Sequence, residues 1–136
     1  MTSINPLVFV DTGAWYALQD ADDRWHEAAL RFFDAMPRLI TTNFVIDETI
    51  TLLSRNLGHG AALAVGEKLW TGALAQIVRV SRADEQAAWN LFKRYDDKTF
   101  SFTDCTSFAV MERLGLREAF TFDDHFAQTG QFIRVP

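Results

Sequence analysis

The chain has 136 residues, a length that suits one compact domain with a sizeable hydrophobic core. Its content of 49% hydrophobic and 23% charged residues is typical of a globular protein and argues against a disordered chain. The net charge of −5 argues at first against a nucleic-acid-binding protein, and the single cysteine excludes an internal disulfide.

Short β-branched or aromatic apolar runs alternate along the chain with longer helical stretches. The runs predict five strands, at Leu7–Val10, Leu39–Thr41, Ile77–Val80, Ala119–Phe122 and Phe132–Val135. Between them, helices are predicted at about 13–20, 23–36, 43–57, 60–74, 84–94 and 104–114. This alternation indicates an α/β fold with a mainly parallel sheet covered by helices on both faces.

Capping residues support several of these boundaries. Thr42, Ser81 and Thr103 precede predicted helices, where a hydroxyl oxygen accepts a hydrogen bond from a free backbone N–H. Gly58 and Gly115 lie just past the ends of two helices, where glycine is the usual terminating residue. We therefore expect six helices with these approximate limits.

Three aspartates are predicted to lie at the same edge of the sheet. Asp11 follows the first strand and Asp123 follows Phe122, the last residue of the fourth predicted strand. Asp104 lies in the first turn of the helix that leads into that fourth strand. Sites in open parallel sheets collect outside the carboxyl ends of the strands, so this edge is the candidate functional site.

The string Asp11-Thr12-Gly13 is also how aspartic proteases present a catalytic carboxylate. Those enzymes are built from β-structure and carry one such string in each of two lobes or subunits. Here the string occurs once and a helical stretch follows it at once. The sequence therefore disfavours a protease.

Glu48 is predicted on the flank of the buried face of its helix, between Phe44 and Leu52, whereas Asp47 falls on the polar side. A carboxylate held against apolar side chains is costly unless a cation meets it. Arg55, two turns further on, is one candidate partner for Glu48. A metal ion bound together with the three aspartates is the other.

Each acid also has an ordinary explanation, as a turn residue, a helix N-terminal residue or half of an ion pair. Their convergence from four separate segments favours a shared site. Two carboxylates about 4 Å apart repel by roughly 4 kcal/mol at an effective dielectric near 20. Such a group needs cations or shared protons, and oxygen ligands suit Mg²⁺ or Mn²⁺ better than zinc.

Four stretches together resemble a known family, namely FVDTGAWYAL, FVIDETITLL, FSFTDCTSFAVMERLGL and AFTFDDHF. In order and approximate spacing they are similar to the PIN-domain toxins of bacterial toxin–antitoxin pairs, the VapC type. The resemblance spans the chain from Val8 to about Phe132. It implies a single PIN domain over residues 1–136, a three-layer α/β/α sandwich with a central, mainly parallel five-stranded sheet.

The resemblance also implies an activity and partners. The family implies a Mg²⁺-dependent endoribonuclease in which water attacks the RNA phosphodiester and leaves a 5′-phosphate and a 3′-hydroxyl. It further implies homodimers and a small cognate antitoxin that blocks the site. Mn²⁺ is the natural substitute for Mg²⁺ in an oxygen-only site.

Position by position, the family's acidic metal cluster corresponds to four residues here: Asp11, Glu48, Asp104 and Asp123. Asp124 remains the alternative for the fourth acid. The residues expected to contact substrate are less specific: Thr12, Thr103 and Arg55. Each of the three adjoins a proposed metal ligand along the chain or lies on the same side of its helix.

The net charge becomes compatible with RNA once the acidic cluster is set apart. Without the four proposed ligands, 14 acids remain against 13 bases. Candidate phosphate contacts are Arg24, Arg31, Arg38, Arg55, Lys68, Lys93, Arg94 and Lys98, most of which we expect on solvated helix faces. Aromatic residues such as Trp25 are expected mainly in the core or an interface, with base stacking as the alternative.

Two further residues near the cluster invite a functional interpretation. Cys105 follows Asp104, but no histidine is placed beside it by the sequence, so we expect a small residue that starts a helix. His125 follows the Asp123-Asp124 pair, and the sequence favours a role in capping a short helix over substrate contact.

Other functions remain as alternatives. A PIN- or flap-type metal-dependent nuclease acting on DNA would carry larger inserts for gripping the duplex, and none is seen. A receiver domain would need an aspartate after the third strand and a lysine after the fifth, whereas Ser81 and Pro136 stand there. A non-catalytic PIN protein that only binds a partner is the third alternative. No apolar run reaches the roughly 20 residues of a membrane span, and residues 1–6 lack an export signal, so we expect a cytoplasmic protein.

Overall fold

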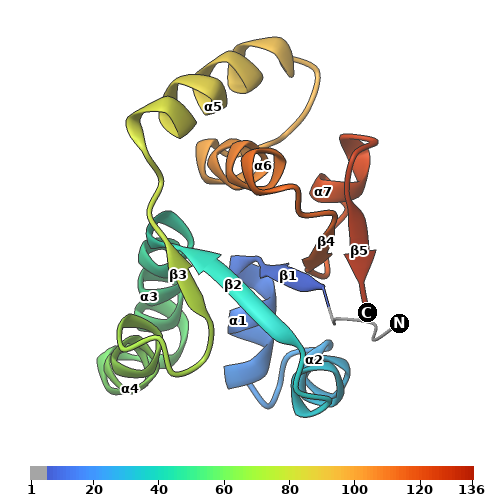
Figure 1. The fold of residues 1–136 in the computed structure, drawn as a ribbon. Helices are drawn as coiled ribbons and strands as arrows, with labels where there is room; N and C mark the ends of the chain where they lie inside the picture. The colour runs from blue at the N-terminus through green and yellow to red at the C-terminus, as the bar shows by residue number, and fades with distance from the viewer. Residues whose placement is uncertain (1–5) are drawn as a thin grey trace.

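A computed structural model describes residues 6–136 of the chain (Figure 1). It contains a five-stranded sheet in which every strand pair is parallel, in the order β3-β2-β1-β4-β5. The strands are β1 (Leu7–Val10), β2 (Arg38–Thr42), β3 (Gln76–Val78), β4 (Glu118–Phe120) and β5 (Ile133–Val135). Most of the segment on which the expected absence of an export signal depends, residues 1–5, lies outside the described residues.

Seven helices connect these strands in the part of the chain that the structure describes. They are α1 (Thr12–Gln19), α2 (His26–Asp34), α3 (Asn43–Leu57), α4 (His59–Trp70), α5 (Arg82–Arg94), α6 (Phe102–Leu114) and α7 (His125–Gln128). In Figure 1, α1 to α4 lie below the sheet and α6 and α7 lie above it, with α5 stacked on the outer side of α6. The predicted three-layer α/β/α class is therefore confirmed.

The sheet forms because its strands can be buried on both faces. Residues 8–10 of β1 are fully buried, and a continuous apolar run is what a covered parallel strand requires. The largest buried side chains on and around the sheet are aromatic, among them Phe9, Trp15 and Phe120. The Trp15 indole N–H still finds a partner, because it donates to Thr41 Oγ1 at 3.3 Å.

Most of the predicted elements are confirmed, although β3 ends at Val78 instead of Val80 and α4 ends at Trp70 instead of near residue 74. β4 ends at Phe120, so Thr121 and Phe122 form a short connection before Asp123 instead of extending the strand. The predicted cap Thr103 is wrong, since Ser101 occupies that position and its Oγ accepts the N–H of Asp104. Helix α7 is the short helix expected beside His125, but no bounds were predicted for it, because four residues carry too little periodicity to be recognised.

The central strands bring the two ends of the chain together. β1 lies between β2 and β4, and Val10 of β1 is in register with Phe120 of β4. The backbone N–H of Asp11 then continues the ladder by donating to the Phe120 carbonyl at 3.1 Å. Asp11 and the segment after β4 are consequently neighbours at the carboxyl edge of the sheet, although about 110 residues separate them.

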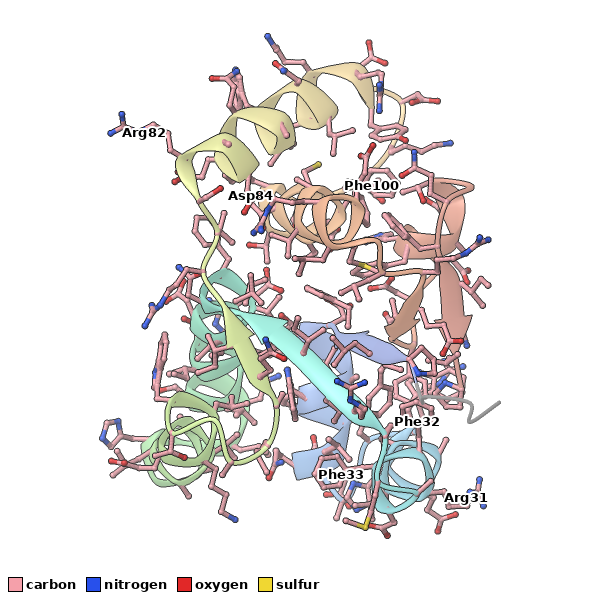
Figure 2. All side chains as sticks on the ribbon, viewed as in Figure 1. Arg31, Phe32, Phe33, Arg82, Asp84 and Phe100 are labelled. Carbon is pink, nitrogen blue, oxygen red and sulfur yellow. The ribbon has the colours of Figure 1, made fainter. Side chains whose placement is uncertain are left out.

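Helix α6 is held in place partly by an ion pair with α5. Asp84, which is 3% exposed, accepts two hydrogen bonds from the Arg113 guanidinium, each 2.8 Å long. Figure 2 shows Asp84 at the start of α5, on the side facing α6. The same carboxylate accepts the N–H of Ser81 and so completes a capping box. This pair fixes the position of the helix that carries Asp104.

Candidate functional site

Asp11 is a buried carboxylate at the carboxyl end of β1. It is 5% exposed, and the Thr121 hydroxyl donates to its Oδ2 at 3.1 Å. Burial raises the pKa of Asp11 well above its ordinary value, and the negative charges of Asp123 and Asp104 raise it further. The fold therefore holds Asp11 where a negative charge is unfavourable without a compensating cation.

Asp104 lies in the first turn of α6 and is 7% exposed. Its Oδ2 accepts the backbone N–H of Ser101 at 3.0 Å and lies 2.8 Å from Nδ1 of His125. Burial raises the pKa of Asp104; the Ser101 N–H and the His125 ring oppose that rise, whereas the charge of Asp123 adds to it. Asp104 thus belongs to the same electrostatic group as Asp11.

Asp123 completes this group from the turn after β4. Its Oδ1 accepts the N–H of His125 at 2.9 Å, and its own N–H donates to Thr121 Oγ1 at 3.3 Å. The alternative, Asp124, turns away and accepts a hydrogen bond from Arg134 at 3.0 Å. The charge of Asp123, and not that of Asp124, adds to the effect of burial in raising the pKa of Asp11, and Asp124 is instead paired with Arg134, so the structure favours Asp123.

His125 contacts the acidic group, contrary to the sequence prediction of a helix-capping role. Its ring nitrogen Nδ1 lies 2.8 Å from Asp104 Oδ2 and 3.9 Å from Asp123 Oδ2. The N-cap of α7 is Asp124, and the local turn is held by Asp123. The only sequence signal for this role was the position of His125 directly after two aspartates.

Glu48 and Arg55 are both on α3, but the structure does not unite them with the aspartates. Glu48 is half-buried, and within residues 6–136 it forms no ion pair with Arg55. Arg55 is exposed in the last turn, about 10 Å beyond Glu48 along the helix axis. Because α3 starts at the carboxyl edge and runs away from it, the substrate contact expected of Arg55 is not supported.

The two predicted threonines differ in their surroundings. Thr12 directly follows Asp11 and is buried, and its hydroxyl has no hydrogen-bond partner among residues 6–136. A buried hydroxyl without a partner is unfavourable and often marks a position for water or an ion. Thr103 is half-buried, and its carbonyl accepts bonds from the hydroxyls of Thr106 and Ser107.

The side chains of the acidic group, Asp11, Asp104 and Asp123, are not arranged as a complete metal-binding site in this structure. Within residues 6–136, no three His, Cys, Asp or Glu side chains converge closely enough to hold a metal ion. The adjacent Cys105 is no alternative nucleophile, since burial raises the pKa of its thiol to about 11. The predicted structural role of Cys105 is therefore favoured.

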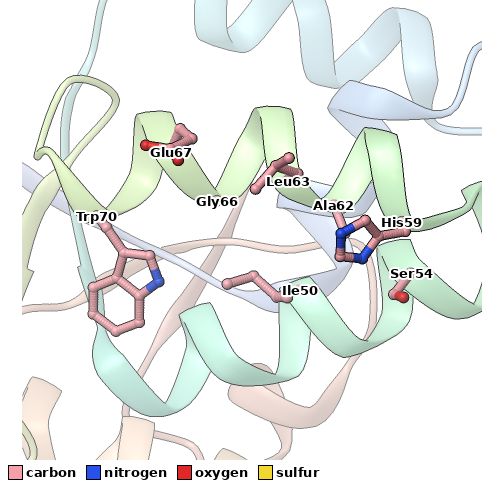
Figure 3. A pocket seen from close by; sticks show the side chains of 8 residues that line it. All are labelled: Ile50, Ser54, His59, Ala62, Leu63, Gly66, Glu67 and Trp70. Atoms are coloured by element: carbon pink, nitrogen blue, oxygen red, sulfur yellow. The ribbon is translucent and has the colours of Figure 1, made fainter.

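An apolar groove lies elsewhere, between α3 and α4 (Figure 3). Ile50, Leu63 and Trp70 point into it, with His59 and Glu67 on its rim. Its volume is about 290 Å³, and Trp70 is 44% exposed there. None of the three aspartates lines this groove, so it is a separate feature of the surface.

No helix within the described range 6–136 has the length and apolar content to cross a membrane.

Known proteins share both the sequence and the fold. The PIN domain family matches residues 8–131. The 23S rRNA-specific endonuclease VapC20 of Mycobacterium tuberculosis is 38% identical over 130 residues, which cover 95% of this chain and 98% of VapC20. The crystal structure of that protein, described as a sarcin–ricin loop cleaving toxin, has a TM-score of 0.89 and covers 94% of this chain and 98% of its own.

More distant structures share the fold alone. FitAcB from Neisseria gonorrhoeae has a TM-score of 0.72 at 12% identity, with 95% of this chain and 96% of that chain covered. VapBC2 from Rickettsia felis, solved with a promoter DNA fragment, has a TM-score of 0.69 at 9% identity, with 95% and 97% covered.

Proposed function

Because the chain belongs to the PIN-domain family, in its VapC-type group, we propose that it is a metal-dependent endoribonuclease, the toxin of a type II toxin–antitoxin pair. The proposal takes residues 1–136 as one PIN domain. The observation that carries it is that Asp104 and Asp123 lie near enough to Asp11, at the carboxyl edge of the sheet, for their charges to raise the pKa of Asp11 beyond the effect of its burial. A domain that only bound a partner would have no need for this unfavourable grouping.

The donor set fits a hard divalent cation, and PIN nucleases in general depend on divalent metals. Three carboxylates and the unpartnered hydroxyl of Thr12 offer oxygen atoms only. Oxygen donors favour Mg²⁺, with Mn²⁺ as a substitute. We therefore assign Mg²⁺, which when bound supplies an activated water and neutralises charge developing on the phosphate.

Four residues of this chain would hold the metal. Asp11 and Asp104 would be the direct ligands, because both are buried and are oriented by the Thr121 hydroxyl and by the Ser101 N–H. Glu48, from α3, and Asp123 would complete the set of oxygen donors.

The surrounding side chains keep these carboxylates in position. Thr121 donates to Asp11 and accepts from the backbone of Asp123, so one hydroxyl links two of the acids. His125 meets both Asp104 and Asp123. Thr12 and Thr103 are the proposed hydroxyl contacts to RNA, Thr12 because its oxygen is unpartnered beside Asp11.

A cleavage assay tests the assignment. Purified protein is incubated with total RNA, with a sarcin–ricin-type RNA hairpin and with a DNA hairpin of the same sequence, each with Mg²⁺ and with EDTA. The identity to VapC20 makes the ribosomal hairpin the first substrate to try. We expect Mg²⁺-dependent cleavage of RNA alone, and at least 100-fold less from Asp11→Asn or Asp104→Asn. Full activity of either variant would refute the assignment, and cleavage of DNA alone would indicate the flap-type alternative.

We also propose a cognate antitoxin, homodimerisation and a cytoplasmic location. The antitoxin proposal is supported by the VapC-type family and by toxin–antitoxin complexes among proteins of the same fold. Co-expression with the product of a small neighbouring reading frame should suppress cleavage. Light scattering on the toxin alone should give twice the mass of one chain; a monomer that cleaves RNA at full rate would rule out an essential dimer.

A further inference from the structure

One arginine and two aromatic rings form a stack that ends at Phe122, the residue before Asp123. The guanidinium carbon of Arg24 lies 4.4 Å from the centroid of the Trp25 ring. The Trp25 ring in turn stacks on Phe122, with centroids 5.2 Å apart and planes only 6° from parallel. Phe122 directly precedes Asp123, so the inner end of the stack is one residue from the acidic group along the chain.

The loop that carries Arg24 is fixed by hydrogen bonds. The N–H of Trp25 donates to Asp23 Oδ2 at 2.9 Å, so the carboxylate of the residue before Arg24 is bound to the backbone. The ring of His26 lies 2.7 Å from the Ala17 carbonyl and ties the start of α2 to α1. The Arg24 side chain is thus presented from an ordered turn.

Arg24 differs from Arg134, the other arginine near the Trp25 ring, in having no acidic partner among the described residues. It is exposed, and among residues 6–136 no carboxylate lies within 4.0 Å of its guanidinium. Arg134 also approaches Trp25, at 5.9 Å, but its Nη1 is paired with Asp124. Contact with the ring orders the Arg24 guanidinium while leaving its N–H donors available.

We propose that Arg24 binds a phosphate of the RNA strand beside the scissile bond, with Trp25 and Phe122 holding the guanidinium in position. The inference rests on the proposed ribonuclease function. A planar guanidinium matches the oxygens of a phosphate and loses less freedom on binding when it is already ordered. Neighbouring nucleotides of a stacked RNA strand are about 3.4 Å apart. A few nucleotides therefore cover the length of the stack from Phe122 to Arg24.

Charge also favours a cation at this point. Asp11, Asp104 and Asp123 repel the phosphates that must approach them, and the bound metal offsets this only at the scissile group. Flanking phosphates need a separate positive contact. Arg24 meets that need because its stack reaches Phe122, next to Asp123.

The test compares Arg24→Ala with Arg31→Ala. Arg31 was also a candidate phosphate contact from sequence, but it is an exposed arginine on α2 that lies over no aromatic ring among the described residues, and its side chain points away from the body of the protein in Figure 2. Its loss therefore removes an equal charge elsewhere. Cleavage of the RNA hairpin gives kcat and KM, and fluorescence anisotropy with the cleavage-deficient Asp11→Asn protein gives Kd at several salt concentrations. Thermal melts check that each variant is folded.

For Arg24→Ala we expect KM and Kd about tenfold higher, kcat within twofold of wild type, and a salt dependence of log K shallower by about one. Arg31→Ala should match the wild type. Arg24→Lys should restore the salt dependence but only part of the affinity, because ammonium lacks the planar fork.

Three results would overturn the inference. Equal RNA affinities of Arg24→Ala and Arg31→Ala would exclude a phosphate contact. A lower kcat with unchanged KM would assign Arg24 to the chemical step instead. Weaker antitoxin binding with unchanged RNA affinity would make the stack a partner surface. Failure of the wild type to cleave any RNA would instead refute the proposed function, so the two failures are distinguishable.

Discussion

Replacing Asp11 with asparagine should stabilise the metal-free protein while abolishing cleavage. The asparagine side chain has almost the same shape, and its oxygen still accepts the hydrogen bond from Thr121. What it removes is a charge that burial and two neighbouring aspartates disfavour. The gain in stability should therefore appear only where the wild-type carboxylate is ionised.

The size of this gain follows from the causes of the pKa shift. Each unit by which folding raises a carboxyl pKa costs about 1.4 kcal/mol of stability once the group ionises. A second carboxylate about 6 Å away adds at most about 3 kcal/mol at an effective dielectric near 20, and much less where solvent screens it. The side chain of Asp123 is 44% exposed, so we discount its share. A net gain of about 1 kcal/mol, or about 4 °C in Tm, is a conservative expectation.

The sign of the pH dependence is fixed by the direction of the shift. Because the pKa of Asp11 is raised on folding, its contribution is fully favourable below about pH 4, the unfolded value, and is lost as pH rises through the folded value. The two proteins should have equal Tm near pH 4. The asparagine variant should become the more stable of the two as the pH increases.

Thermal melts in EDTA between pH 4 and pH 8 measure the effect. Asp47→Asn, which neutralises an exposed acid on α3, is the matched control and should show a nearly constant difference. A pH-independent difference for Asp11→Asn, or a variant less stable at pH 8, would refute the reasoning. Added Mg²⁺ should raise the Tm of the wild type more than that of the variant.

Three shorter predictions concern the surroundings of the site. Arg113→Met should lower the free energy of unfolding by about 1–2 kcal/mol in urea melts at pH 7, because it leaves the buried Asp84 carboxylate without its cation. The expected loss is this small because Arg113 is 43% exposed and solvent screens the pair. That loss should vanish as pH falls below about 4, because the pair holds the pKa of Asp84 below its usual range; a loss that persists in acid would contradict the ion-pair explanation. Cys105 should react with thiol reagents at pH 8 only in denaturant, since its thiol pKa is about 11; fast native labelling would contradict this. His125→Ala should move the acidic limb of the pH–rate profile upward, because the His125 ring lowers the pKa of Asp104; an unshifted limb would exclude that coupling.

The sheet and three of the acids were predictable because local patterns determine them. Short apolar runs defined the strands, and a residue that directly follows a parallel strand must lie at its carboxyl edge, as Asp11 does. Asp104 was predictable for a similar reason, since a helix start has a strong sequence signal. Asp123 was predicted at the correct edge despite the strand ending two residues earlier.

What sequence could not supply was the direction of side chains in turns and the distances along helices. The choice between Asp123 and Asp124 depends on the turn, which points one acid toward Asp11 and the other toward Arg134. A helical wheel gives the direction of each side chain around the helix axis but not its position along the axis. It therefore grouped Arg55 with Glu48, although two helical turns separate them. The contact between His125 and Asp104 joins α7 to α6, and no local sequence pattern indicates that these two helices meet.

The register between β1 and β4 has a consequence for how the protein is made. Asp11 is translated early. Its neighbours in the sheet and in the acidic group come from residues 104–123, and β5, which pairs with β4, is translated last. A nascent polypeptide therefore cannot assemble this edge until nearly all of it has left the ribosome. Any activity of this edge therefore has to wait until translation of the chain is almost finished.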